Sequence, residues 1–219
     1  MQKNLTELVF IVDRSGSMAG MEADTVGGVN SVLKKNAQAE GDAVVSVVLF
    51  DHEAEVLVDR RPIDEVAPLT EEDYWVRGCT ALLDALGGGI KFIDRVHRYL
   101  PEEAKPAKTI FVITTDGMEN DSHKFTYSQV KGMVDAKQAE GWEFLFLGAN
   151  IDAVEEAERI GIPANRAATY LNDSTGAGVM YDAVADATCC MRMCEPSAGG
   201  APVDDGWKRA IERDTRARR

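Results

Sequence analysis

Cysteine and histidine are both scarce in this sequence, with four cysteines and three histidines among 219 residues. Four cysteines are too few to staple a disulfide-rich secreted module, and two of them, Cys189 and Cys190, are adjacent, which hinders separate bridges. We therefore expect a reducing compartment, the cytoplasm. Cys189, Cys190 and Cys194 also lack the C-x-x-C spacing of a zinc site, so we expect buried or half-buried thiols on a helix.

Long apolar runs and excess positive charge are missing as well. The apolar stretch near the amino end covers only residues 8–12, which is too short for a signal-peptide core or a membrane span. Lys and Arg number 24 against 37 Asp and Glu, and the net charge of −13 repels nucleic acid and anionic membranes. Neither is therefore an expected partner. The composition, 45% hydrophobic and 28% charged, is that of an ordinary globular domain.

Common nucleotide-binding and hydrolase motifs are also missing. The sequence has no Walker loop, no G-x-G-x-x-G fingerprint and no nucleophile elbow. A run of three glycines at residues 87–89 lacks the preceding strand that a phosphate cradle needs. We interpret this run as a place where a helix packs closely on a sheet.

The sequence does contain alternating strand and helix patterns. Five short apolar runs predict buried strands, of which the second and third form a hairpin. They cover residues 8–12, 44–50, 54–58, 109–114 and 144–147. Apolar residues at three- and four-residue spacing predict helices that alternate with the strands. The helices cover residues 19–39, 82–100, 126–140, 152–160 and 177–194.

This alternation predicts an α/β fold with a doubly wound, mostly parallel sheet and helices on both faces. The domain is expected to span residues 1–194. The remaining residues, 195–219, begin with a segment rich in Pro, Gly and Ala and end with residues 207–219, whose local net charge is +4. We interpret them as a linker and a basic tail that is either solvated or docked on its own domain.

Oxygen-bearing side chains follow two of the predicted strands and precede the longest helix. Asp13, Ser15 and Ser17 come directly after the first strand, Asp116 follows the fourth, and Thr80 precedes the helix. Because ligands of parallel sheets bind beyond the carboxyl ends of the strands, we expect these five side chains to meet at one edge.

Hydroxyl and carboxylate oxygens suit a hard divalent cation, Mg²⁺ or Mn²⁺, whereas zinc would favour His or Cys. Each residue also has a simpler explanation. Ser15 and Ser17 would serve as caps of the first helix, Thr80 would serve as the cap of the long one, and Asp116 would simply begin a turn. The joint placement of all five residues favours the metal site.

Three motifs carry a family resemblance: D-R-S-G-S beginning at Asp13, G-C-T ending at Thr80, and T-D-G centred on Asp116. Together they resemble the metal-ion-dependent adhesion site of the von Willebrand factor type A (VWA) family, and the resemblance covers residues 5–190. It implies a Rossmann-like VWA fold of about six strands with one antiparallel edge strand, and residues 167–170 supply the sixth. The most similar type is the small intracellular bacterial one.

The resemblance also implies a role for each ligand. Ser15, Ser17 and Thr80 would coordinate the metal directly, while Asp13 and Asp116 would hold coordinating waters or bind according to state. Neutral hydroxyl ligands leave the cation, Mg²⁺ or alternatively Mn²⁺ or Ca²⁺, with much of its charge. An acidic side chain of a protein partner would then complete the coordination, so we expect a binding module and not an enzyme.

Two alternatives stay open. One is a metal-dependent phosphohydrolase-like enzyme, although Ser15 occupies the position where that chemistry commonly needs a second carboxylate. The other is a scaffold in which the metal is only structural. Arg14 and Arg77 would steer an acidic partner toward the site or would be ordinary surface charges.

Overall fold

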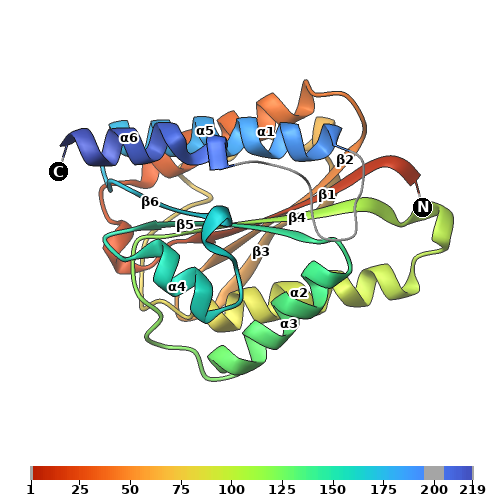
Figure 1. Cartoon of the computed structure of the whole chain (residues 1–219), viewed down its shortest axis with the longest axis horizontal. Helices are drawn as coiled ribbons and strands as arrows, with labels where there is room; N and C mark the ends of the chain where they lie inside the picture. The colour runs from red at the N-terminus through yellow and green to blue at the C-terminus, as the bar shows by residue number, and fades with distance from the viewer. Residues whose placement is uncertain (1, 195–204, 219) are drawn as a thin grey trace.

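The computed structural model describes residues 2–194 and 205–218. Its centre is a six-stranded sheet in the order β3-β2-β1-β4-β5-β6, in which every neighbouring pair is parallel except β2 and β3. The strands are β1 (Gln2–Asp13), β2 (Ala43–Phe50), β3 (Ala54–Pro62), β4 (Pro106–Thr115), β5 (Glu143–Ala149) and β6 (Ala167–Tyr170). The predicted mostly parallel sheet with one antiparallel edge strand is confirmed (Figure 1).

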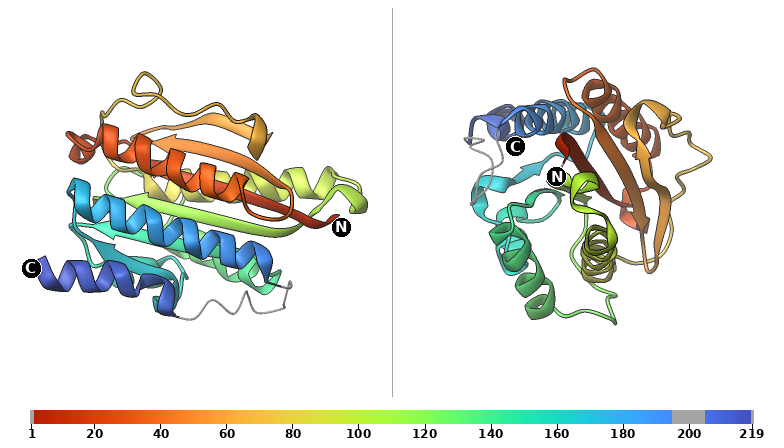
Figure 2. Two further views of the ribbon diagram at one scale, coloured as in Figure 1. Left: turned by 90° about the horizontal axis from the view of Figure 1, so that it is seen from above. Right: turned by 90° about the vertical axis from the view of Figure 1, so that its right-hand side faces the viewer.

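Helices cover both faces of this sheet, as predicted. They are α1 (Glu22–Ala37), α2 (Leu82–Tyr99), α3 (Tyr127–Ala139), α4 (Ala153–Arg159), α5 (Ser174–Met193) and α6 (Arg209–Arg218). The buried side chains of α1 and α5 join one core, and those of α2, α3 and α4 join the core on the opposite face. Figure 2 shows α1 and α5 side by side, with α6 next to α5.

The central strand β1 shows why its sequence is a continuous apolar run. Leu8, Phe10 and Val12 belong to the core under α1 and α5, whereas Val9 and Ile11 belong to the core under α2. Successive side chains of a strand point to opposite faces, so a strand covered on both faces buries every one of them.

The helix predictions differ from the structure mainly at the amino ends. The first helix was expected from residue 19, but residues 16–18 form a 3-10 turn and α1 begins at Glu22. The last helix begins at Ser174 instead of residue 177, because Asp173 caps it by accepting a hydrogen bond from the backbone of Gly176 at 2.8 Å. Apolar periodicity carries no information about such polar helix starts.

Of the three glycines in α2, Gly89 makes the close contact with the sheet that we expected, whereas a Cβ at Gly88 would meet no atom of the described residues within 4 Å. A Cβ at Gly89 would lie 3.2 Å from the side chain of Ile11 in the sheet. A Cβ at Gly87 would lie 2.9 Å from the ring of Phe125, in the loop before α3. Larger residues at these two positions would push α2 away from its neighbours.

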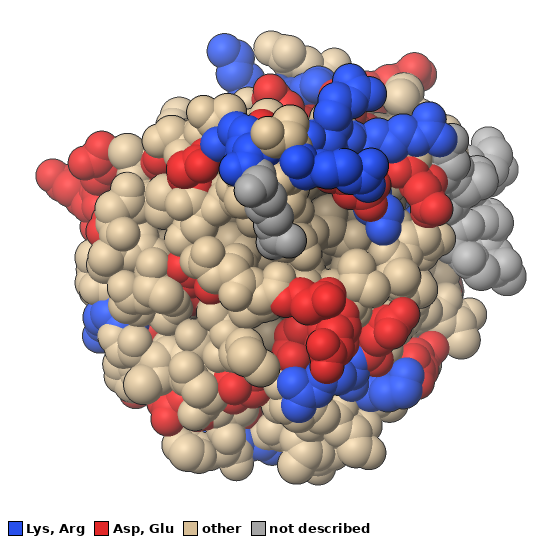
Figure 3. All heavy atoms as spheres, turned by 60° about the vertical axis from the view of Figure 1, so that its left-hand side comes forward, with Lys and Arg blue, Asp and Glu red and all other residues tan. Residues whose placement is uncertain are grey.

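Residues 205–218 fold back onto the domain. A 3-10 turn (Asp205–Lys208) leads into α6, which packs beside β6 and α5. Ile211 is buried there, and Thr215 donates a hydrogen bond to the backbone oxygen of Thr169 at 3.1 Å. Figure 3 shows Lys and Arg gathered over this helix. The predicted division between residues 194 and 195 stays a prediction, because residues 195–204 lie outside the described residues.

Strand order and register bring the predicted ligands toward one another. β1 and β4 are parallel neighbours in which Val12 lies opposite Thr114, so Asp13 and Thr115 end their strands at the same sheet edge. The loops that follow β1 and β4 and the loop that precedes α2 all meet at this edge. Among the described residues, no helix has both the length and the apolar character that a membrane crossing requires.

Candidate metal centre

Asp13 is the buried centre of the cluster at the sheet edge. One carboxylate oxygen, Oδ1, accepts a hydrogen bond from the backbone N–H of Ser15 at 2.7 Å. The other, Oδ2, accepts from the hydroxyl of Thr115 at 2.6 Å, and the backbone oxygen of Asp13 accepts from the hydroxyl of Tyr74 at 2.5 Å. Two hydrogen bonds therefore hold the Asp13 side chain in one orientation, and a third holds its backbone.

The two serines connect Asp13 with Asp116. The hydroxyls of Ser15 and Ser17 lie 3.1 Å apart, and Ser17 donates to Oδ1 of Asp116 at 2.5 Å. The second oxygen of Asp116 accepts from the side-chain amide of Asn172 at 3.0 Å. The D-R-S-G-S turn and the T-D-G turn, about 100 residues apart in sequence, are thus in direct contact.

Thr80 lies beside the same cluster. A Cβ placed on Gly117 would be 3.3 Å from Oγ1 of Thr80 and 3.5 Å from Oγ of Ser17, so both hydroxyls border one small space that a side chain at Gly117 would fill. The loop of Thr80 also contacts the first turn, because the backbone N–H of Gly16 donates to the backbone oxygen of Gly78 at 3.2 Å. The structure therefore brings all five predicted residues to one place.

Hydrogen bonds between the loops keep Thr80 there. The backbone N–H of Thr80 donates to the side chain of Asn120 at 2.9 Å, and the backbone N–H of Asn120 donates to the backbone oxygen of Thr80 at 3.0 Å. Glu119 accepts from the backbone N–H of Leu83 at 2.9 Å. Sequence reasoning assigned no specific partners to Asn120 and Glu119, since polar loop residues are usually solvated.

Helix capping does not explain the three hydroxyls. Ser15 precedes the 3-10 turn but its side chain makes no capping hydrogen bond, and the residue before α1 is Met21. The residue before α2 is Ala81, not Thr80. The simpler explanation given above for these hydroxyls is therefore wrong.

The two carboxylates are poorly neutralised. Burial raises the pKa of the Asp13 carboxyl to about 6, although hydrogen bonds from Thr115 and Ser15 oppose this shift. Burial also raises the pKa of Asp116, against hydrogen bonds from Ser17 and Asn172. Within the described part of the chain, no Lys, Arg or His forms an ion pair with either carboxylate. The cluster concentrates negative charge that a cation would offset.

The donor set fits a hard divalent cation. Three hydroxyls and two carboxylates supply only oxygen, which matches Mg²⁺, Mn²⁺ or Ca²⁺ better than a metal that prefers nitrogen or sulfur. No group of three or more His, Cys, Asp or Glu side chains is placed to hold a metal among residues 2–194 and 205–218. Of the thiols expected to be buried or half-buried, Cys189 and Cys194 are half-buried, but the expectation is wrong for Cys190, which is exposed.

Arg14, by contrast, is neither a partner-facing charge nor a surface charge. Its side chain is completely buried, with Nε donating to Asp51 at 2.8 Å and Nη1 lying 2.8 Å from the carboxylate of Glu55. Arg77 donates to the same oxygen of Asp51 at 2.8 Å and remains partly exposed. Both interpretations of Arg14, steering charge and surface charge, are wrong, because its guanidinium neutralises a buried carboxylate.

Comparison with solved structures places the fold in a known class: it is a VWA-like α/β fold. No protein-family model matches the sequence, and no curated protein matches it either. Its structural neighbours are VWA domains. The vWF type A protein from Catenulispora acidiphila is 14% identical, with a TM-score of 0.57 over 84% of this chain and 43% of its own.

Two further neighbours carry informative descriptions. Proximal thread matrix protein 1 from the mussel byssus, solved with zinc in its MIDAS motif, is 16% identical, with a TM-score of 0.57 over 85% of this chain and 46% of its own. The pilus adhesin SpaC from Lactobacillus rhamnosus GG is 12% identical, with a TM-score of 0.64 over 86% of this chain and 30% of its own. The chain thus spans less than half the length of each, and the likeness concerns the fold.

Proposed function

We propose that this protein is a VWA domain with a metal-ion-dependent adhesion site that binds an acidic side chain of a protein partner through a divalent cation. Ser15, Ser17 and Thr80 would hold the cation directly, and Asp13 and Asp116 would hold it through water or according to state. Mg²⁺ is the preferred ion, with Mn²⁺ and Ca²⁺ as alternatives. The proposal includes a cytoplasmic location and the small intracellular bacterial type, for which the support is the cysteine content and the resemblance of the motifs.

One observation carries this proposal. Hydroxyls from two separate loops border the space beside Gly117, next to two buried carboxylates that no described Lys, Arg or His neutralises. A purely structural cluster would be expected to pair its buried acids with basic side chains, because an uncompensated buried charge is costly. A bound cation would supply the missing positive charge.

The ligand types favour recognition over catalysis. Three neutral hydroxyls leave a divalent cation with most of its charge, so it retains affinity for one more anionic ligand. A carboxylate from another protein is such a ligand. The zinc reported at the MIDAS motif of the mussel protein and the adhesin activity named for SpaC belong to those proteins, and they support this interpretation by analogy only.

Metal binding is tested by titrating the full chain with Mg²⁺ in a calorimeter. We expect binding by the wild type, at least about tenfold weaker binding by Thr80→Ala, and no heat with Asp116→Ala, because each removes an oxygen beside the same space. Thr175→Ala, at an exposed position of α5, is the matched control and should bind like the wild type. Equal affinity of Thr80→Ala and Thr175→Ala would contradict the site.

Partner recognition is tested by affinity capture from a native lysate in Mg²⁺, in chelator, and with Thr80→Ala in Mg²⁺. We expect proteins that are captured only in the first arm and that are released by free acidic peptide. Identical proteins in all three arms, together with a metal-dependent rise in melting temperature, would support the purely structural alternative. Metal-dependent hydrolysis of a phosphate ester that Thr80→Ala abolishes would support the enzyme alternative.

A further inference from the structure

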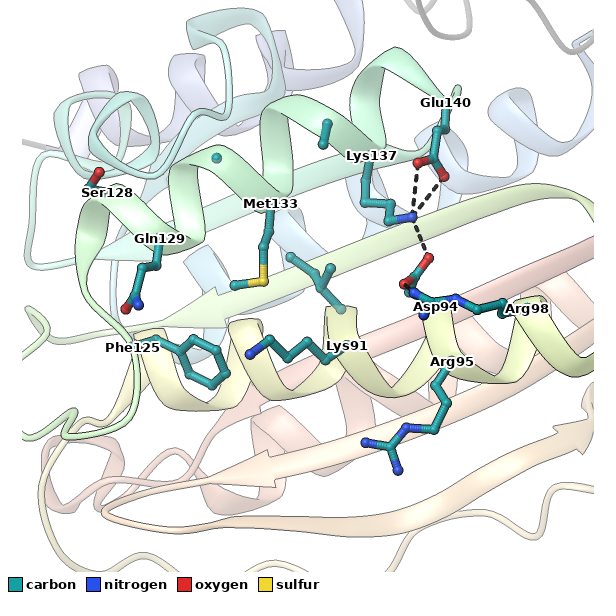
Figure 4. A pocket seen from close by; sticks show the side chains of 13 residues that line it. Lys91, Asp94, Arg95, Arg98, Phe125, Ser128, Gln129, Met133, Lys137 and Glu140 are labelled. Atoms are coloured by element: carbon teal, nitrogen blue, oxygen red, sulfur yellow. Dashed lines mark hydrogen bonds and ion pairs between the residues drawn. The ribbon is translucent and has the colours of Figure 1, made fainter.

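A groove runs between α2 and α3, on the sheet face opposite α1 and α5. Its volume is about 690 Å³, and Ile90, Phe125 and Met133 provide its apolar surface. Figure 4 shows Met133 pointing from α3 toward α2, and Phe125 lying at one end of the groove. A Cβ at Gly132, which also lines the groove, would meet nothing within 4 Å, so the surface there is open.

Positive charge borders this apolar surface. The ammonium of Lys91 lies 4.4 Å from the centre of the Phe125 ring, and Arg95 is exposed on the next turn of α2. Within the described residues, neither Lys91 nor Arg95 has a carboxylate partner. Because the chain as a whole carries a net charge of −13, two unneutralised cations beside one groove depart from its average surface.

An ion-pair network lies at the opposite end of the groove. Asp94 of α2 accepts hydrogen bonds from Arg98 at 2.5 Å and from Lys137 of α3, and Lys137 also donates to Glu140 at 2.8 Å. These residues are drawn together in Figure 4. The network fixes the spacing of the two helices at this end, so the groove is a preformed surface and not a loose gap.

The hollow continues past this network. A second hollow of about 500 Å³ shares Asp94, Arg98, Lys137 and Glu140 with the groove. The groove itself is lined by Phe125, Met133, Arg95 and Arg98. Aromatic residues, methionine and arginine are the residue types that protein interfaces favour.

We propose that this groove, defined by Ile90, Lys91, Arg95, Phe125, Gly132 and Met133, binds an amphipathic helix of a partner protein whose polar edge is acidic. The apolar face of that helix would pack against Phe125 and Met133 over the open position at Gly132. Its carboxylates would pair with Lys91 and Arg95. This is the helix-in-groove mode of recognition, and it is independent of the metal centre.

Charge and surface chemistry favour a protein helix over a nucleic acid. A polyanion approaching this chain meets the repulsion of its large negative net charge, whereas a short acidic helix places only a few charges at the positive border. The apolar surface of Phe125 and Met133 also has no use in contacts with a phosphate backbone, which are ionic or hydrogen-bonded.

The test uses a displayed library of helical peptides of about 15 residues, or about four turns, with randomised surface positions. The target is the full chain in chelator, which keeps the metal centre out of the measurement. Gly132→Leu fills the groove, and Gly178→Leu is its matched control, because that helical glycine in α5 also has nothing within 4 Å of a Cβ. Replacing a helical glycine by leucine favours the helix, so both variants should fold.

A second pair of variants tests the charges. The double variant Lys91→Glu, Arg95→Glu reverses the two positive charges that border the groove. The double variant Arg209→Glu, Arg213→Glu reverses two exposed charges of α6 and is the control. We expect selected peptides with an apolar stripe and acidic edge, bound equally by the wild type and both controls. Gly132→Leu should bind them at least about tenfold more weakly than the wild type does. The double variant at Lys91 and Arg95 should bind them about fivefold to tenfold more weakly.

Two results would overturn the proposal. One is that Gly132→Leu and the double variant at Lys91 and Arg95 bind the selected peptides as tightly as the wild type does. The other is a single-stranded RNA of similar length that binds the wild type more tightly than any acidic peptide and loses its affinity in the same two variants. Neither result bears on Mg²⁺ binding, so this proposal fails or stands separately from the proposed function.

Discussion

Asp13 and Asp51 stand at the carboxyl ends of the adjacent strands β1 and β2, yet their surroundings are opposite. Asp51 accepts hydrogen bonds from the guanidinium groups of Arg14 and Arg77, each at 2.8 Å. Burial by itself raises the pKa of Asp51, but the bonds from Arg77 and Arg14 outweigh it and the pKa is lowered. Asp13 receives only neutral donors, and its pKa is raised to about 6.

This contrast separates carboxylates that stabilise the fold from carboxylates suited to a ligand. Glu7, in the middle of β1, belongs with Asp51, because Arg60 and His97 both bind it. Asp116 belongs with Asp13. Basic side chains neutralise the carboxylates of Asp51 and Glu7, but those of Asp13 and Asp116 have no such partner among the described residues. We therefore expect an external cation to neutralise the second pair.

The largest expected effect comes from breaking the compensated pair. Arg14→Met should lower the free energy of unfolding by about 3 kcal/mol, because it removes one partner of a fully buried ion pair. Urea denaturation measures this change. Arg61→Met, at an exposed position of β3, is the control and should change stability by less than about 0.5 kcal/mol. Equal effects of the two variants would show that the buried pair is not stabilising.

The next effect concerns Glu7 and pH. Burial raises the pKa of Glu7, but hydrogen bonds from His97 and Arg60 outweigh it and hold the pKa below the ordinary value of 4.5. Because the folded state has the lower pKa, ionised Glu7 stabilises the fold above pH 4.5, and this contribution is lost as the pH falls through the folded-state pKa. Glu7→Gln should therefore lower the free energy of unfolding by about 2 kcal/mol at neutral pH and by less in acid.

Denaturant titrations at a series of pH values measure the Glu7 effect. Glu158→Gln, which changes an exposed carboxylate of α4, serves as the control. A Glu7→Gln deficit that is as large in acid as at neutral pH would contradict the assigned charge state.

A smaller effect of opposite sign is expected at Asp13. Asp13→Asn in chelator should raise the free energy of unfolding by about 1 to 2 kcal/mol, because it removes a buried charge and leaves a group that is able to bond Thr115 and Ser15. The same variant should lose the rise in melting temperature that Mg²⁺ gives the wild type. Asp59→Asn, at an exposed position of β3, should change neither quantity. Destabilisation of Asp13→Asn in chelator would show that its charge is compensated after all.

The smallest effect on stability is expected at Asn172, which donates to Asp116 at 3.0 Å. Asn172→Ala should change the free energy of unfolding by less than about 1 kcal/mol and weaken Mg²⁺ binding about tenfold, since it frees one oxygen of Asp116 to reorient. Urea denaturation measures the stability and calorimetric titration measures the Mg²⁺ affinity. In both, the exposed variant Asn165→Ala is the control. Unchanged Mg²⁺ affinity would exclude Asn172 from positioning Asp116.

Much of the fold was predictable because its signals are local. The apolar run at Leu8 to Val12 and the three- and four-residue spacing in α2 each report the burial of their own segment. The five candidate ligands were also predictable as a group, since the carboxyl ends of neighbouring parallel strands must share one sheet edge. Their coordination of a metal remains a prediction.

The compensation of the charges was not predictable from the sequence. Arg14, Asp51 and Arg77 are far apart along the chain, and no local pattern shows that Arg14 turns inward to a carboxylate 37 residues away. Asn172 follows the short edge strand β6 and reaches Asp116 across the sheet edge. Such pairs depend on how loops meet in three dimensions, and composition and periodicity carry no information about that.

The central claim is that the hydroxyls of Ser15, Ser17 and Thr80 surround one divalent cation beside Asp13 and Asp116. Crystals of the full chain grown with Mn²⁺ test it directly, because the anomalous scattering of the metal locates it without assumptions about ligands. The account predicts one strong anomalous peak within bonding distance of those three hydroxyls, about 2.0 to 2.3 Å, which Thr80→Ala weakens. A map with no peak there, or with its main peak at another carboxylate cluster, would contradict it.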